Sequence, residues 1–170
     1  MKNAITFLIV FGFISILACT SKKQEGIIIT DDVLYNLVKS PTSFTYYKNT
    51  LDTLLADPAT NGSHGNYVRI RFNQKAISAL NDSVSSPIKT YFPNESLIVK
   101  EVYDQSGSAL LVLAVMYKFP GSANSGSGWV WAEYLPNGQV AYSSINKGAI
   151  CVSCHARGNN FDLVQTFLYH

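Results

Sequence analysis

Two cysteines and a histidine near the carboxyl end have the types and the spacing of a haem attachment motif. Cys151, Cys154 and His155 lie within the stretch GAICVSCHARGN, residues 148–159. Two thiols one helical turn apart can form thioethers with the two vinyl groups of a haem, and an imidazole directly after them can bind the iron. The motif therefore predicts one covalently attached haem c, with its iron, in each chain.

Two other uses of these cysteines stay open on the residues alone. A redox pair or a small structural disulfide has the same C-x-x-C spacing, although too little sequence follows Cys154 for the βαβ unit of a thioredoxin-like site. A tetrahedral zinc site requires further ligands, and only His64 and His170 remain beyond the histidine of the motif. Haem attachment is the leading interpretation.

The first residues have the pattern of an export signal that ends in a lipid-modified cysteine. Lys2 precedes an apolar run from Ala4 to Ala18, which is too short for a comfortable membrane span, and the sequence ILAC that ends it resembles the bacterial lipobox. We expect residues 1–18 to be a signal peptide and residues 19–29 a tether with lipid on Cys19. The protein would then be an exported bacterial lipoprotein on the periplasmic or cell-surface side of a membrane. An ordinary signal peptide or an uncleaved anchor is the alternative.

Composition indicates one globular domain over residues 30–170. The 170-residue chain is 47% hydrophobic and only 14% charged, which favours a packed core over disorder. Its formal net charge is +2 and it has no basic run, so nucleic-acid binding is not indicated. If Cys19 carries lipid, the motif cysteines are the only remaining thiols, and no disulfide joins distant segments.

The elements that must position the motif change from helices to strands along the chain. Thr30 and the two acidic residues after it predict a helix over residues 31–38. Further helices are expected over residues 43–55 and, in a short capped form, over residues 73–80. Alternating or β-branched stretches predict strands over residues 67–72, 96–103, 110–119, 128–134 and 139–143. The expected fold is α+β, a mainly antiparallel β-sheet with flanking helices and a c-type haem near the C-terminus.

The sequence does not supply an obvious second ligand for the iron. No methionine follows the motif, and Met116, the only internal one, lies mid-strand in LVLAVMYKF, where a core position is its default. His64 stands in a loop, where a surface or hydrogen-bonding role is more common. We therefore expect a five-coordinate iron with an open side at which a small molecule can bind or react.

An ordered set of short motifs covers most of the chain from His64 onward. The set consists of SHG (63–65), VRI (68–70), Asn73, FP (92–93), IVKE (98–101), GWVW (128–131), NG (137–138), CVSCH (151–155), Asp162 and Phe167. This pattern resembles the cytochrome P-460 family, which includes the beta-type cytochromes c-prime. C-x-x-C-H alone is widespread, whereas the ordered set is much more specific.

The resemblance implies a mainly antiparallel fold, usually a homodimer, in which a histidine is the single protein ligand of the iron. Cytochromes P-460 proper add a lysine that is cross-linked to the haem edge, and they oxidise hydroxylamine; Lys100 stands at that position. The c-prime relatives lack the cross-link and bind nitric oxide under an aromatic cap, a distal-pocket role open to Phe92. On the residues alone, Lys100 could instead cover apolar surface with its stem while its ammonium group reaches water.

One departure from the family pattern bears on catalysis. Members that oxidise hydroxylamine carry a distal carboxylate on the strand before the tryptophan segment, whereas residues 110–115 are wholly apolar here. Glu101 and Glu133 are possible substitutes, although glutamates on alternating strands commonly face solvent. Without such a base, proton removal from hydroxylamine has no acceptor, so enzymatic activity stays open.

The sequence therefore predicts a membrane-anchored mono-haem c-type cytochrome whose His155-ligated iron binds or oxidises nitric oxide, hydroxylamine or a similar small nitrogenous ligand. One alternative is an electron-transfer lipoprotein that serves an unidentified redox partner. Another is a non-haem lipoprotein in which Cys151 and Cys154 form a structural disulfide. Dimerisation is an expectation from the resemblance alone.

Overall fold

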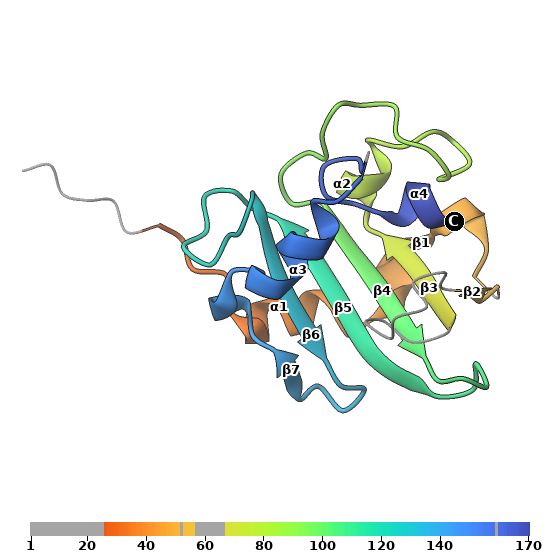
Figure 1. The fold of residues 1–170 in the computed structure, drawn as a ribbon, viewed down its shortest axis with the longest axis horizontal. Coiled ribbons are helices and arrows are strands. Elements are labelled where there is room, and N and C mark those ends of the chain that lie inside the picture. The colour runs from red at the N-terminus through yellow and green to blue at the C-terminus, as the bar shows by residue number, and fades with distance from the viewer. Residues whose placement is uncertain (1–25, 52, 57–66, 159) are drawn as a thin grey trace, which may run out of the picture.

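The computed structural model describes residues 26–51, 53–56, 67–158 and 160–170, and within them the chain forms one antiparallel sheet with short helices around it (Figure 1). The described strands are β1 Thr45–Tyr46, β2 Leu55–Ala56, β3 Tyr67–Phe72, β4 Leu97–Tyr103, β5 Leu110–Lys118, β6 Trp129–Tyr134 and β7 Val140–Tyr142. Their order is β1-β3-β4-β5-β6-β7, with β2 also paired to β3. The described α-helices are α1 Asp31–Val38, α2 Gln74–Ile77, α3 Ala149–His155 and α4 Thr166–Tyr169. Single 3₁₀ turns are η1 Pro41–Ser43, η2 Tyr47–Asn49 and η3 Ser144–Asn146.

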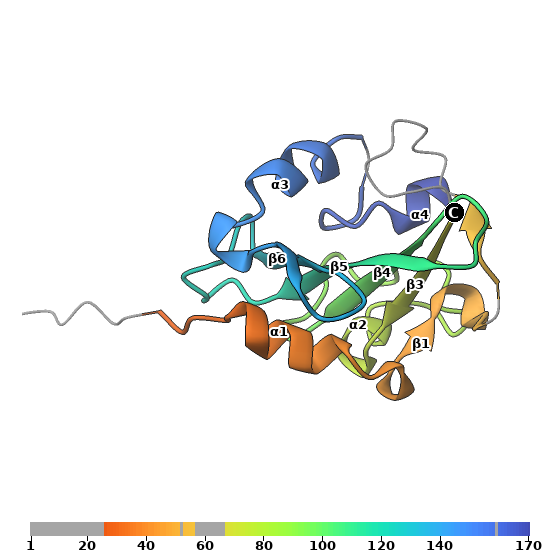
Figure 2. The same cartoon turned by 90° about the horizontal axis from the view of Figure 1, so that it is seen from below.

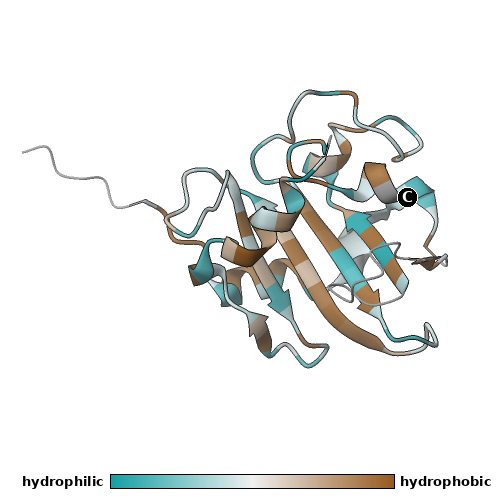
Figure 3. Cartoon of the chain, viewed as in Figure 1, coloured by the Kyte–Doolittle hydropathy of each residue, from teal (hydrophilic) through white to brown (hydrophobic). Residues whose placement is uncertain are grey.

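Helices lie on both faces of the sheet. Figure 2 shows α1 against one face and α3 and α4 against the other. Because successive strand residues point to opposite faces, β4 sends Val99 toward α1 and Ile98 toward the face that carries α3. Apolar residues occupy most of the central strand β5 in Figure 3, as expected for a strand covered on both sides.

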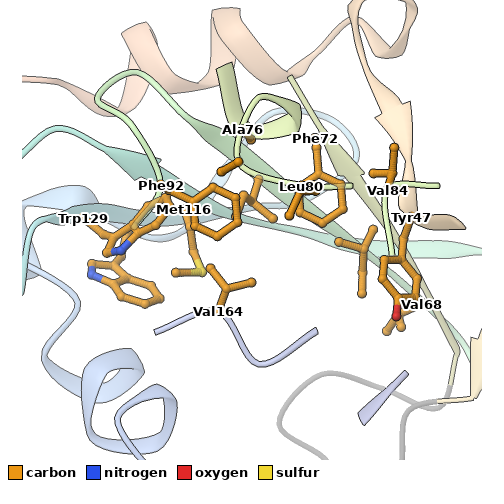
Figure 4. Close-up of a cluster of buried hydrophobic side chains, with 14 residues drawn as sticks. Tyr47, Val68, Phe72, Ala76, Leu80, Val84, Phe92, Met116, Trp129 and Val164 are labelled. Atoms are coloured by element: carbon orange, nitrogen blue, oxygen red, sulfur yellow. The ribbon is translucent and has the colours of Figure 1, made fainter. Parts of the chain in front are cut away.

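Two core clusters result from this arrangement. The cluster on the α1 face contains Leu34 and Val38 of the helix and apolar residues of β4, β5 and β6. The cluster on the opposite face, drawn in Figure 4, contains Phe72, Met116 and Trp129 together with Val164 from the C-terminal segment. The second cluster continues toward α3 and therefore forms the base on which the attachment motif rests.

The first helix forms as its sequence predicts. The Oγ1 atom of Thr30 accepts a hydrogen bond from the Val33 N–H at 3.3 Å, and Asp31 and Asp32 occupy the first turn, where the helix dipole favours acidic side chains. All five predicted strands are present, with ends that differ by a residue or less from those expected. The short capped helix is also present as α2, with Asn73 as its N-cap.

The helix expected over residues 43–55 is wrong. This stretch holds the two-residue strand β1, which pairs with β3, and a turn in which Lys48 and Asn49 have φ of 54° and 55°. Tyr46 and Tyr47 are adjacent yet both buried, 8% and 4% exposed, which an extended segment between two packed surfaces allows. Tertiary burial of these rings outweighs the helical pattern of the local sequence.

The expected signal peptide and the lipidated Cys19 lie outside the described residues. Ile29, at the end of the expected tether, is buried and donates its N–H to Ser122 Oγ at 3.2 Å. Among the helices that the structure describes, none is long and apolar enough to cross a membrane.

Candidate haem site

A cavity of about 430 Å³ lies between the sheet on one side and α3 with the C-terminal segment on the other. Its volume falls in the range of pockets that hold small molecules and cofactors. The sheet contributes Ile70, Ile98, Lys100, Ala114, Met116, Trp131 and Glu133 to its wall. The opposite wall contains Ile150, Cys151, Cys154, His155, Val164, Gln165, Thr166 and His170.

Strand register explains why the cavity opens at this place. Ile70, Lys100, Ala114 and Glu133 are direct cross-strand neighbours in successive pairs from β3 to β6. They consequently form one row across the sheet on the face that carries α3. Ala114 stands in the middle of this row, and its single methyl group leaves room between the longer side chains of Lys100 and Glu133.

Helix α3 brings the whole attachment motif to the cavity. Positions i, i+3 and i+4 of a helix share one face, and Cys151, Cys154 and His155 have that spacing. Both thiols are free; Cys154 is exposed and Cys151 is half-buried. Burial, with Glu133 as a further cause, raises the pKa of the Cys151 thiol to about 11. The thiol is therefore protonated at neutral pH.

The His155 ring is held in one tautomer. Its Nδ1 atom lies 2.8 Å from the carbonyl oxygen of Leu163. Because a carbonyl oxygen only accepts hydrogen bonds, Nδ1 carries the proton and Nε2 keeps its lone pair. The ring packs edge-on against Trp131 with centroids 5.0 Å apart, and burial lowers the pKa of His155. A neutral imidazole is the form that binds iron.

These residues fit a covalently attached haem. Two thiols and an imidazole line one wall of the cavity, while the opposite wall is largely apolar and includes Ile70, Ile98 and Trp131. A porphyrin needs such an apolar space beside its attachment points. Within the described residues no three His, Cys, Asp or Glu side chains are grouped as ligands for a metal ion.

The structure separates the two glutamates that were possible distal carboxylates. Glu133 lines the cavity, and burial raises its pKa above the usual value. Glu101 points to the opposite face of the sheet, where it forms ion pairs with Arg69 at 2.9 Å and Arg71 at 3.0 Å. Of these two glutamates, Glu133 alone is placed to exchange a proton with a ligand in the cavity.

Replacing Glu133 by glutamine should stabilise the protein in a pH-dependent way. Since the folded-state pKa lies above the ordinary value of 4.5, the buried charge destabilises the folded state at pH values above that folded-state pKa. The cost falls as pH drops through the folded-state pKa and is gone below 4.5, where the carboxyl group is protonated in both states. Urea unfolding of Glu133→Gln should therefore show a larger gain at about pH 8 than at about pH 4.

The exposed Glu95 supplies the control for this comparison. Its side chain is 57% exposed, so Glu95→Gln should change the free energy of unfolding little at either pH. An equal gain from Glu133→Gln at both pH values would contradict a buried carboxylate.

The other predicted site residues are divided between the cavity and the core. Lys100 lines the cavity. Phe92 is 2% exposed and packs edge-on against Trp129 and Phe161 at centroid distances of 5.7 and 5.1 Å. The structure thus places Phe92 in the core cluster and not among the residues that line the cavity. His64 lies outside the described residues.

The C-terminal segment supplies cavity residues that the sequence did not indicate. Val164, Gln165, Thr166 and His170 line the wall beside α3. Gln165 connects this segment to the motif, because its Nε2 atom donates a hydrogen bond to the Cys154 carbonyl oxygen at 2.9 Å. No periodic pattern marks this segment, so the only available signal was its closeness to the motif in sequence.

Comparison with known proteins identifies the family. Residues 45–166 match the family described as Cytochrome P460, and this range includes Lys100, Glu133 and the C-x-x-C-H motif. No curated protein matches the chain. The matched range covers well over half of the sequence and most of the residues that line the cavity. The chain therefore belongs to the cytochrome P460 family.

Proposed function

We propose that this haem-binding cytochrome holds one c-type haem through thioethers to Cys151 and Cys154, with His155 Nε2 as the axial ligand of the iron. We propose further that a small nitrogenous ligand, nitric oxide or hydroxylamine, binds to the iron on the side opposite His155. The observation that carries this proposal is the position of two free thiols and a neutral imidazole on one wall of a largely apolar cavity. When bound, the haem supplies an iron that can bind the ligand and exchange electrons.

The residues around the cavity have separate tasks in this proposal. The Leu163 carbonyl fixes the ring of His155, and Trp131 supports it from the side. Ile70 and Ile98 provide apolar surface that keeps water away from the bound ligand. An apolar pocket favours a small ligand of low charge over a charged one.

Glu133 would act as the proton acceptor that oxidation of hydroxylamine requires. Its carboxylate lines the cavity on the row that also holds Lys100, and its raised pKa brings it closer to the pH at which a general base works well. In this chain the carboxylate would come from β6, since Leu110, Leu111 and their apolar neighbours on β5 offer none.

A second candidate function is electron transfer, and one observation favours it. His170 lines the same cavity as His155, and Met116 is also in its wall. If the side chain of either residue bound the iron from its other side, the site would be closed to small ligands and suited to electron transfer alone.

Absorption spectra of the matured protein test the two functions. With haem-maturation machinery present, the purified protein should show c-type bands, and its dithionite-reduced form should bind nitric oxide readily. Failure to bind nitric oxide, with binding restored by His170→Ala or Met116→Leu, would support the closed electron-transfer site. The absence of c-type bands from the matured wild-type protein would contradict both functions.

Replacing Lys100 by arginine should show whether its amine is bonded to the haem edge. Lys100 lines the cavity, so a bond from Nζ would extend the conjugated system and give a broad, red-shifted Soret band. Lys100→Arg should then remove the shift and leave the haem attached through its thioethers. A red shift that survives the substitution would exclude Lys100 as its cause, and Lys75→Arg, on an exposed side chain, is the matched control.

Membrane attachment completes the proposal. We expect lipid on Cys19 to hold the domain at a membrane surface, because the export signal ends in a lipobox-like sequence.

A further inference from the structure

The carbonyl group that fixes His155 belongs to an unusual turn. Asp162 and Leu163 are the central residues of a turn from Phe161 to Val164, which is closed by a hydrogen bond from the Val164 N–H to the Phe161 carbonyl oxygen at 2.8 Å. Asp162 has φ of 49° and Leu163 has φ of 69°. Two successive positive φ angles favour glycine, asparagine or aspartate, so Asp162 suits this turn whereas Leu163 is strained. Something in the surrounding structure must hold the turn in place.

Asp162 connects the turn to the sheet, while within the segment the Leu163 N–H donates to Asn160 Oδ1 at 2.8 Å. The Oδ1 atom of Asp162 forms an ion pair with Lys118 Nζ at 2.7 Å, and its Oδ2 atom accepts the Phe92 N–H at 3.0 Å. Its carbonyl oxygen accepts the indole N–H of Trp129 at 3.0 Å. Contacts from β5, from β6 and from the loop before β4 thus converge on a single residue of the turn.

The ion pair is buried and well supported. The side chains of Lys118 and Asp162 are only 11% and 8% exposed. The Lys118 ammonium group also lies over the Trp129 ring, 4.9 Å from its centroid. Separating the partners of a buried ion pair strongly destabilises the folded protein, because a charge is left buried without a partner. This pair therefore tolerates little displacement of Asp162 relative to the sheet.

We propose that the Lys118–Asp162 ion pair positions the turn so that the Leu163 carbonyl oxygen keeps its hydrogen bond from His155 Nδ1. This hydrogen bond would in turn set the basicity of His155 Nε2 as a ligand of the iron. The inference rests on the proposed role of His155 as iron ligand. Hydrogen bonds from the second nitrogen of a ligating histidine raise its basicity, and loss of such a partner typically costs about tenfold to about 100-fold in metal affinity. A more basic imidazole favours the ferric over the ferrous state, so a firmly held carbonyl keeps the reduction potential low.

Asp162→Asn and Lys118→Met each remove the ion pair while keeping a side chain of similar size. Each should weaken the preference of the site for ferric iron by about tenfold, which raises the midpoint potential by about 59 mV for a one-electron couple. The iron–histidine stretching frequency of the ferrous protein should fall in the same variants. Lys118→Arg, which restores a cation, should return both quantities toward the wild-type values.

A second buried ion pair provides the matched control. Arg71→Met removes the pair with Glu101, whose side chains are 3% and 7% exposed, on the face of the sheet away from His155. This variant should lose stability without changing the potential or the stretching frequency. The inference is overturned if Asp162→Asn leaves both quantities unchanged, or if Arg71→Met shifts them equally.

Failure of the underlying proposal has a different signature. If the wild-type protein itself shows no iron–histidine stretch, His155 does not bind iron, and the proposed function falls together with this inference. If the wild-type protein shows the stretch and Asp162→Asn does not alter it, only the positioning role falls.

Discussion

Replacing Cys151 and Cys154 together by alanine should leave the protein with no covalently bound haem after expression with haem-maturation machinery. Both thiols line the cavity, and thioethers can form only at their sulfur atoms. Haem retained through denaturing electrophoresis, which detects only covalent attachment, should therefore disappear completely. Either single variant should keep one thioether and part of the signal.

Two comparisons make this result specific to the attachment motif. His155→Ala should retain haem through denaturation, because both thiols remain, but should lose the iron–histidine signal. Cys19→Ser should keep the full haem signal, because Cys19 lies far from the motif in sequence and its expected modification is a lipid. Haem that survived denaturation in the double cysteine variant would contradict the assignment of the thioethers.

Replacing Gly148 by alanine should destabilise the protein by about 2–6 kcal/mol and disrupt the haem site. Gly148 caps α3 with φ of 65°, and a Cβ atom on it would lie 2.2 Å from Cδ1 of Trp131. Trp131 cannot easily give way, since it is 2% exposed and its indole N–H is bound to the Gly126 carbonyl oxygen at 3.0 Å. The start of α3 would have to move, and with it the attachment motif.

Urea unfolding of Gly148→Ala and Gly158→Ala measures this effect. Gly158 has a similar φ of 68°, but the atom nearest to a new Cβ would be Leu168 Cδ1 at 3.8 Å, an ordinary contact. Gly158→Ala therefore carries the backbone strain without the clash and should cost only about 1–3 kcal/mol. An equal loss in the two variants would contradict the close contact between the start of α3 and Trp131.

Local patterns were sufficient to predict much of the sheet. The alternation of residues 67–72 and the β-branched stretches after it predicted strands that the structure confirms, because a strand with a buried face leaves a period of two in its sequence. The helix expected over residues 43–55 failed because Tyr46 and Tyr47 are buried by contacts with distant segments. Contacts of that kind leave no local periodicity to detect.

The site, too, was predictable where local sequence determines it and not where contacts between distant segments do. The attachment motif could be predicted because its spacing is contained in five consecutive residues. Glu101 could have been excluded as a cavity residue from the sequence alone. It directly follows Lys100 on one strand, and successive strand residues face opposite sides of the sheet. The position of Glu133 depends on the register of β6 against β5, and that of Phe92 on how a long loop packs, and neither follows from the local sequence.

The mass of the intact protein after maturation tests the central claim most directly. The purified protein should have the mass of its polypeptide and any lipid plus that of one haem, and the haem should remain attached after denaturation. A protein that carries no haem after expression with the complete maturation machinery, with Cys151 and Cys154 joined in a disulfide, would contradict the assignment of this chain as a c-type cytochrome.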